Sequence, residues 1–419
     1  MTGALPVVSP EGMPRRPLWA GRTTALLGIL LVAANLRTGV ASLSPIISRV
    51  DVDIALPPAL VGLLGMLPPL CFAVFGIVTP LIAKRFGLER TIVVALVLLV
   101  AGLTGRSLAP EAVTLVAASV LVFAAVGVGN VLLPPLVKKY FADRVGLVTT
   151  LYVSIMSVST FLPPLVAVPV ADAAGWRTSL GEWAVVAVIA AVPWVALVVR
   201  SRAAQAGGEL DDEEPRAGQV RLALRSPIAW SLAVVFSVTS FNVYVMFAWL
   251  PSILSSVAGV GDAEAGVLLS LYAAMGLPAA LLVPLLAARH GKVRLLVAVS
   301  VASFLVGYGG LLVAPAFATW LWVAFAGTGP LLFPLALVLI NLRTRTHDGT
   351  IALSGVVQSV GYLIAAVGPI LIGVLHEATG GWTWPIAVLA ATAVPAAVFG
   401  FRAARPGYLE DGYPADSRV

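Results

Sequence analysis

Charged residues are scarce in this sequence, and so are the residues that catalysis and metal binding use most. Only 11% of the 419 residues are charged, whereas roughly 25% is usual for a soluble domain. The single cysteine, Cys71, excludes a disulfide framework, and the three histidines lack metal-ligand spacing. No G-x-x-x-x-G-K-[ST] phosphate loop is present, and no Ser/His/Asp set can be assigned to one surface. We therefore expect no enzyme activity, no cofactor and no bound metal.

Long apolar runs take the place of the missing charge, and 59% of the residues are hydrophobic. A helix that crosses a membrane needs about 20 apolar residues. Twelve runs meet this requirement: residues 23–47, 57–83, 91–108, 112–137, 146–170, 182–200, 227–251, 264–288, 294–314, 318–342, 350–375 and 382–401. The sequence therefore predicts an all-α membrane protein with 12 transmembrane helices.

The basic residues are distributed unevenly between the two sides of these spans. Of the 26 lysines and arginines, 22 lie in the two tails and in the loops that follow even-numbered spans. The opposite loops carry only Arg49, Arg106 and Arg177. Because cytoplasmic loops are enriched in Lys and Arg, we expect a multi-pass protein of the plasma membrane with both termini in the cytoplasm. The excess of basic residues then reports topology, and we expect no nucleic-acid partner.

The longest polar stretch lies between the sixth and seventh spans, at residues 200–226. It mixes both signs of charge with glycine and alanine, which is typical of a flexible linker. We expect two six-helix bundles with the following boundaries: a cytoplasmic tail at 1–22, a first bundle at 23–200, a linker at 201–226, a second bundle at 227–401 and a second tail at 402–419.

The two halves resemble each other at a nearly fixed offset. "PLIAKRFGLER" (80–90) matches "PLLAARHGKVR" (284–294), and "GVGNVLLPPL" (127–136) matches "GTGPLLFPLA" (327–336). Pro163 aligns with Pro369 in the same way. Parallel six-helix repeats of this kind predict two bundles that face each other across a central cavity, with a binding site near the middle of the membrane.

Four segments carry a resemblance to a known family: "NLRTGVASLSPII", "GVGNVLLPPLVKKYF", "FAWLPSIL" and "VVQSVGYLIAAVGPILIGVLHEATGGW". They resemble the cyanate permease and 2-nitroimidazole transporter family, a branch of the major facilitator superfamily, and the similarity runs from about residue 26 to 400. The two basic loops also resemble that superfamily's loop motif, although Lys84 and Ala288 replace its usual acidic residue. The resemblance implies transport of a small solute and leaves the solute open.

Arg37 is the most conspicuous candidate for a binding site. It lies roughly 21 Å along the first span, at 1.5 Å per residue, and a bare guanidinium at such depth costs several kcal/mol or more. All 20 acidic residues fall in tails, loops or span ends, so no carboxylate is expected at its depth. A planar fork of five donors suits a small delocalised anion. We expect Arg37 to face the cavity and bind an anionic substrate; pairing with backbone carbonyls, Asn side chains or water is the alternative.

Other polar and aromatic residues within the spans are weaker candidates. Tyr244 and Asn242 lie in span seven, where Trp249 is either part of a cavity wall or an interface anchor. Gln358 and Tyr362 are four residues apart in span eleven, so they share one helix face, and either a solute or a neighbouring helix is their partner. Asn130 follows two glycines in span four, which suits close helix packing as well as a site. We also considered Asn35, which favours packing, and Tyr152.

These observations predict a secondary transporter that works by alternating access on a small monovalent anion such as cyanate, as a monomer. Arg37, Tyr244, Gln358, Tyr362, Asn130 and Asn242 are the predicted substrate-binding residues. The first alternative is efflux of a neutral, flat compound such as 2-nitroimidazole. The second is a membrane sensor that transports nothing, which would usually carry a further soluble domain.

Overall fold

The computed structural model describes residues 22–141, 143–203 and 222–412, and within these ranges all regular structure is helical. The first half contains α1 (Thr23–Asn35), α2 (Thr38–Ala41), η1 (Ser44–Ile46), α3 (Ile47–Asp53), α4 (Pro58–Phe86), α5 (Leu88–Ser107), α6 (Ala112–Tyr140), α7 (Val145–Ala174) and α8 (Trp176–Ala203). The second half contains α10 (Pro227–Ala258), α11 (Asp262–Ala274), α12 (Gly276–Pro284), η2 (Leu285–Arg289), α13 (Val293–Val313), α14 (Thr319–Thr328), η3 (Gly329–Leu331), α15 (Leu332–Leu342), α16 (His347–Thr379), α17 (Thr383–Ala391), α18 (Ala393–Ala403) and η4 (Leu409–Gly412). The predicted tail at 1–22 and linker at 201–226 fall mostly outside the described residues.

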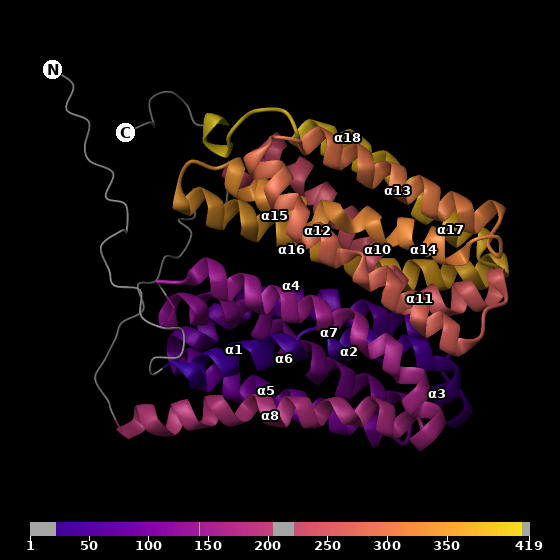
Figure 1. The fold of residues 1–419 in the computed structure, drawn as a ribbon, viewed down its shortest axis with the longest axis horizontal. Coiled ribbons are helices and arrows are strands. Elements are labelled where there is room, and N and C mark those ends of the chain that lie inside the picture. The colour runs from indigo at the N-terminus through magenta and orange to yellow at the C-terminus, as the bar shows by residue number, and fades with distance from the viewer. Residues whose placement is uncertain (1–21, 142, 204–221, 413–419) are drawn as a thin grey trace.

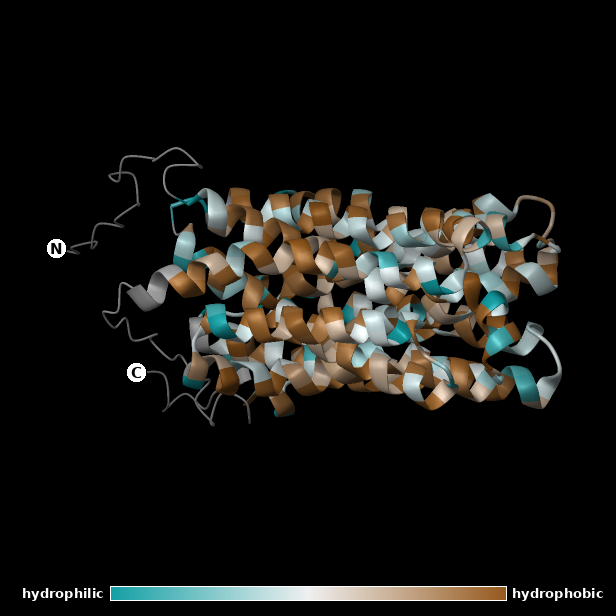
Figure 2. Ribbon diagram, turned by 90° about the horizontal axis from the view of Figure 1, so that it is seen from below, coloured by the Kyte–Doolittle hydropathy of each residue, from teal (hydrophilic) through white to brown (hydrophobic). Residues whose placement is uncertain are grey.

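In the described part of the chain, twelve helices, or runs of short helices, are long and apolar enough to cross a membrane, which confirms the predicted number of spans. The first span extends to Asp53, beyond the predicted residue 47, and α10 extends to Ala258, beyond residue 251. Hydrophobic residues cover most of the length of the helices (Figure 2). Many large apolar side chains on their outer faces are exposed, among them Val97, Val192 and Val394. Such a surface is suited to lipid.

The helices form two bundles that lie side by side, α1–α8 in one and α10–α18 in the other (Figure 1). The first described helix, α1, begins and the last, η4, lies at the same end of the molecule in Figure 1, and we call this end the N/C face. The opposite end, where α3 approaches α7 and α11, is the far face. The fold class predicted from the sequence is therefore confirmed.

The first span is interrupted where Arg37 lies. Helix α1 ends at Asn35, and α2 covers only Thr38–Ala41. The Thr38 hydroxyl donates to the Asn35 carbonyl at 3.1 Å, so a side chain takes up an acceptor that a continuous helix would use. Pro45 follows within η1 and lacks a backbone N–H, so one helical hydrogen bond is missing at this point. As a result, the regular helical hydrogen bonding of the first span is interrupted near its middle.

The internal repeat reappears as a pair of equivalent contacts between the bundles. Gly62 of α4 packs on α16, where a Cβ would lie 3.0 Å from the Pro369 carbonyl oxygen. Gly266 of α11 packs on α7, where a Cβ would lie 2.8 Å from the Pro164 carbonyl oxygen. Small residues allow such close approach of helix backbones. The two halves therefore make similar close contacts, each between a glycine and a proline carbonyl, although the second uses Pro164, the neighbour of the residue that aligns with Pro369.

Candidate functional site: a cavity between the bundles

A cavity of about 1070 Å³ lies between the two bundles. Its walls come from the first span, α4, α6 and α7 on one side and from α10, α11, α12, α14, η3, α15 and α16 on the other. The lining reaches Tyr152 and Thr350, which are close to the N/C-face ends of α7 and α16. Most lining side chains are apolar, with a few polar groups among them, as in small-molecule sites generally. The cavity therefore extends from the middle of the spans toward the N/C face.

Arg37 lines this cavity at the break between α1 and α2 and is partly buried. Its guanidinium carbon lies 6.0 Å from the centre of the Phe72 ring, which is at the limit of a cation–π contact. Among the described residues, no carboxylate pairs with Arg37 and no acceptor takes a hydrogen bond from its side chain. The charge is therefore presented to the cavity without a protein counter-ion in the described chain.

Three aromatic rings surround the position of Arg37. Tyr244 of α10 and Tyr362 of α16 have ring centres 6.4 Å apart, and Phe72 of α4 lies 6.4 Å from Tyr244 and 5.9 Å from Tyr362. All three pairs meet edge to face, which is a favoured aromatic geometry. Both tyrosines line the same cavity as Arg37. One charge from the first bundle and two phenols from the second thus converge on one place.

Two predicted amides also line the cavity. Gln358 donates from Nε2 to the Ser354 hydroxyl at 2.6 Å, and it shares the cavity-facing side of α16 with Tyr362, as the four-residue spacing predicted. Asn130 of α6 donates from Nδ2 to the Val126 carbonyl at 3.1 Å, a bond within its own helix. Tyr152 lines the cavity nearer the N/C face. The oxygen atoms of both amides have no hydrogen-bond donor among the described residues.

Asn242, in contrast, lies away from the cavity lining and is fully buried in the second bundle. Its Nδ2 donates to the Val238 carbonyl at 2.8 Å and to the Thr392 hydroxyl at 2.9 Å. Its Oδ1 accepts a hydrogen bond of 2.7 Å from the Tyr308 hydroxyl. Because every polar atom of the amide is occupied within one bundle, Asn242 has the surroundings of a structural residue.

Asn35 and Trp249 also lie outside the cavity lining. The Asn35 amide donates to the Leu31 and Val186 carbonyls, so it joins α1 to α8. The Trp249 ring is buried, and its Nε1 donates to the Pro369 carbonyl at 2.9 Å, so it joins α10 to α16. The interpretation of Asn35 as a packing residue agrees with these contacts. Trp249 is neither a cavity wall nor an interface anchor.

Phe72 as a wall of the site and the burial of Arg106 were not predicted from the sequence. Phe72 is one apolar residue among many in α4, and nothing in the sequence distinguishes it. The expectation that Arg106 lies in a loop is wrong, because it occupies the last turn of α5 and only 1% of it is exposed. An arginine so close to a span end resembles a loop residue in sequence, and the direction of its side chain becomes evident only in the fold.

The cavity offers binding without the usual means of catalysis. The described part of the chain contains no group of three or more His, Cys, Asp or Glu residues that could hold a metal ion. None of the described residues that line the cavity is acidic or a histidine. The site can therefore hold a small solute through one positive charge, two phenols, two amides and an apolar wall. Two six-helix bundles around such a cavity define a membrane transporter.

Comparison with known proteins identifies its family. A sequence profile of the Major Facilitator Superfamily matches residues 26–351. The chain is 34% identical to an uncharacterized transporter, YycB, of Bacillus subtilis (92% of this chain, 94% of the relative) and 33% identical to a 2-nitroimidazole transporter of Escherichia coli (92% and 96%). It is 25% identical to the cyanate transport protein CynX of Escherichia coli (85% and 91%). The chain belongs to the Major Facilitator Superfamily, and the resemblance stated from its sequence motifs is confirmed.

A solved structure shows the same fold. A bacterial homologue of the human lysosomal transporter Spinster, in an inward-facing and occupied conformation, superimposes with a TM-score of 0.71 at 16% identity. The match covers 96% of this chain and 100% of that one. Taken with the family, the fold makes this protein a secondary transporter of a small molecule in a lipid bilayer.

Proposed function

We propose that this transporter carries a small monovalent anion such as cyanate across the plasma membrane by alternating access, with Arg37 as the charge that binds the anion. The observation that supports the proposal is the cavity position of Arg37 without a counter-ion among the described residues. Its planar guanidinium can donate two parallel hydrogen bonds to a delocalised anion. Tyr244, Tyr362, Gln358 and Asn130 supply neutral contacts around it.

The energetics of the empty site explain how binding is coupled to movement. Closing an apolar cavity around an unpaired guanidinium removes that charge from water, which costs several kcal/mol. A bound anion offsets the cost because the pair is neutral when the bundles close. The empty carrier then closes less readily than the loaded one.

We propose that the N/C face is cytoplasmic, because the basic residues are concentrated there. The structure then has its cavity extended toward the cytoplasm and its far face closed. The far face is held by the two glycine–proline contacts and by the Ser44 hydroxyl, which donates to the Ala248 carbonyl across the bundles at 3.2 Å.

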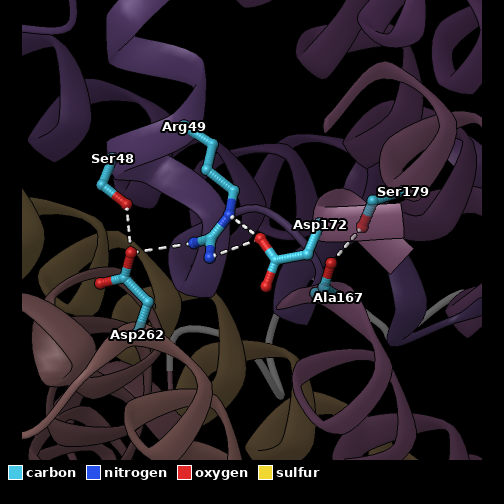
Figure 3. A network of polar contacts seen from close by, with 6 residues as sticks. All are labelled: Ser48, Arg49, Ala167, Asp172, Ser179 and Asp262. Carbon is cyan, nitrogen blue, oxygen red and sulfur yellow. Dashed lines mark hydrogen bonds and ion pairs between the residues drawn. The ribbon is translucent and has the colours of Figure 1, made fainter. Parts of the chain in front are cut away.

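An ion-pair network adds to the closure of the far face (Figure 3). Arg49 of the first bundle contacts Asp172 of the same bundle at 2.8 Å and Asp262 of the second bundle at 2.9 Å. The Ser48 hydroxyl also donates to Asp262 at 2.8 Å. Separation of the bundles would break the Asp262 contacts and leave the Asp172 pair intact, so Arg49 would keep a partner in both states.

The cavity lining also bears on energy coupling. Proton-coupled carriers usually place an Asp, Glu or His within the membrane, and no described lining residue is of these types. The proposal therefore assigns no proton-binding role to the protein. The proposal is compatible with three modes of transport: facilitated diffusion, exchange, and movement of a proton together with the substrate.

Efflux of a neutral flat compound is the second candidate function. The cavity volume of about 1070 Å³ far exceeds the size of cyanate, and three aromatic edges suit a heterocycle. A relative at 33% identity is a 2-nitroimidazole transporter. In this case Arg37 would hold a nitro group. We propose a monomer in either case, because one chain supplies all walls of the cavity.

Uptake by purified protein in liposomes tests the proposal. Radiolabelled cyanate should accumulate in wild-type vesicles, and Arg37→Gln should lower the initial rate at least 100-fold. Arg37→Lys should keep part of the rate because it keeps the charge. Arg402→Gln, which removes an exposed arginine from the last turn of α18, is the matched control and should behave as wild type. Normal cyanate uptake by Arg37→Gln would contradict the anion mechanism, and flux of 2-nitroimidazole alone would favour the second candidate.

A further inference from the structure

A second arginine is buried within the membrane-spanning region, and the proposed function does not use it. Arg106 is 1% exposed. Its Nη1 donates to the Gly39 carbonyl at 2.8 Å, and its guanidinium carbon lies 5.6 Å from the centre of the Phe123 ring. Its Nε atom is buried without a hydrogen-bond partner. Among the described residues, no carboxylate contacts it.

Burial of the Arg106 guanidinium costs free energy that an exposed position at the membrane interface would avoid. A guanidinium carries five N–H donors. In Arg106, Nη1 is the nitrogen that donates to an acceptor among the described residues, the Gly39 carbonyl. Near a helix end, an arginine can extend to the membrane interface and keep its charge in water. The dipole of α5 favours a cation in the last turn by only about 0.3–1 kcal/mol, whereas an unpaired buried charge costs several kcal/mol. Packing alone therefore does not account for Arg106.

The same short helix positions both buried arginines. Arg37 immediately precedes α2, and Arg106 binds the carbonyl of Gly39 within it. Because α2 ends at Ala41, its last carbonyls have no helical partner and are free to accept. Gly39 also allows α2 to pack closely on α6, since a Cβ there would lie 2.6 Å from Val122 Cγ1, while Arg106 Nη1 would be at an ordinary contact distance of 3.7 Å. The break in the first span thus places one guanidinium at each end of α2.

Arg106 lines a small cavity that adjoins the main one. Its volume is about 30 Å³, enough for one or two water molecules. Val40, Tyr244 and Phe247 line both cavities and form the partition between them. The small cavity is also lined by Ser44, which belongs to the far-face closure. Because its walls come from both bundles, it must widen when the far face opens.

We propose that Arg106 forms a second anion site, on the far side of the Val40–Tyr244–Phe247 partition, which receives the same small monovalent anion from Arg37 when the far face opens. This inference rests on the proposed function, because the ligand is the anion that Arg37 binds. The anion then encounters a positive charge on each side of the partition during its passage. Arg37 serves the cavity that extends to the N/C face, and Arg106 serves the path to the far face.

Separate measurements of binding and transport test the proposal. In detergent, thiocyanate should raise the melting temperature of wild type and of Arg106→Gln at half-saturating concentrations that agree within twofold, because this state exposes the Arg37 site. In liposomes, Arg106→Gln should transport cyanate at least tenfold more slowly than wild type, and Arg106→Lys should recover to within about threefold of wild type. Arg37→Gln should lose both signals, and Arg402→Gln should keep both.

A second measurement leaves Arg106 in place, in case its substitution impairs folding. Leu43 lines only the small cavity, so Leu43→Cys in a Cys71→Ala background reports on it. Thiocyanate should slow labelling of that cysteine by an external methanethiosulfonate at least threefold. When Arg106→Gln is added and the protein still folds, at least tenfold more thiocyanate should be needed for the same protection.

The possible failures have different meanings. One possible result is that wild type transports cyanate, Arg37→Gln does not, and Arg106→Gln transports it at the normal rate. This result would overturn the second site and keep the proposed function. If thiocyanate does not change the labelling of Leu43→Cys, the second site is likewise overturned and the proposed function is kept. A wild-type protein that neither binds thiocyanate nor moves cyanate would overturn the proposed function, and the second site with it.

Discussion

The two bundles bury a polar contact in the same place, between their first and third spans, and they complete it differently. In the second bundle, Tyr308 of α13 donates to Asn242 of α10, and the amide donates in turn to Thr392. In the first bundle, Arg106 of α5 donates to the Gly39 carbonyl, and its Nε remains unpaired. A neutral network with every partner present stabilises a rigid frame. A charged side chain with unused N–H donors, such as Arg106, is able to bind a further ligand.

The same division holds at the main cavity. Arg37, its one basic lining residue among those described, comes from the first bundle, whereas Tyr244, Gln358 and Tyr362 come from the second and are neutral. The duplicated halves therefore share an architecture and differ in chemistry: one bundle supplies the charge and the other supplies neutral walls. The predictions below test this division, beginning with the largest effect expected.

Loss of the hydrogen bonds that join Tyr308, Asn242 and Thr392 should lower the stability of the protein and leave its transport activity intact. Asn242→Ala deprives Tyr308 and Thr392 of a buried partner, and such losses cost about 1–3 kcal/mol each. We expect a melting temperature several degrees lower, with a KM for cyanate within twofold of wild type in the protein that remains folded. The measurement is a thermal melt paired with liposome uptake. A large rise in KM at unchanged stability would place Asn242 in the site after all.

If the two glycine–proline contacts contribute equally to the far-face closure, substitution of either glycine should have the same effect. A methyl group at Gly62 or Gly266 meets a carbonyl oxygen of the opposite bundle, and overpacking of this kind costs typically 1–3 kcal/mol. Both Gly62→Ala and Gly266→Ala should therefore weaken the far-face closure by roughly 5- to 150-fold. Labelling of Leu43→Cys from the far side should accelerate by a similar factor in each. Acceleration in only one of the two would show that the interfaces are unequal.

The ion pairs of the far face should contribute least. The side chains of Arg49 and Asp262 are 25% and 41% exposed, and exposed pairs are worth about 0–1 kcal/mol. Asp262→Asn should raise far-side labelling of Leu43→Cys by no more than about fivefold, and 1 M salt should reproduce part of the effect in wild type. Asp172→Asn is the matched control, because its pair with Arg49 lies within one bundle. An equal effect of the control would exclude a role for the pair between bundles.

Much of the fold could be predicted from the sequence, because the length of an apolar run is itself the physical requirement for spanning a membrane. The repeat was visible as well, since equivalent contacts such as Gly62 and Gly266 need equivalent residues. The break at Arg37 was not predicted, because it depends on a side-chain hydrogen bond from Thr38 and on the tertiary contact of Arg106 with Gly39.

The site was predictable only in part, for a related reason. Arg37 was identified by elimination, as a charge with no carboxylate at its depth. The orientation of Asn242 and Trp249 was not predictable, because a helix that is apolar on all sides gives no periodic signal for the face that lines a cavity. Arg106 shows the same limit at a span end, where interface and interior residues have the same sequence pattern.

The central claim is that Arg37 moves an anion, and the response of uptake to membrane potential tests it most directly. In wild-type vesicles, an inside-positive potential set with potassium and valinomycin should increase cyanate uptake several-fold over an inside-negative one. In Arg37→Gln vesicles, uptake should be near background at either potential. Uptake by Arg37→Gln that follows the potential as wild type does would contradict the account, whereas wild-type uptake that ignores the potential would restrict the mechanism to electroneutral exchange or to movement of a proton with the anion.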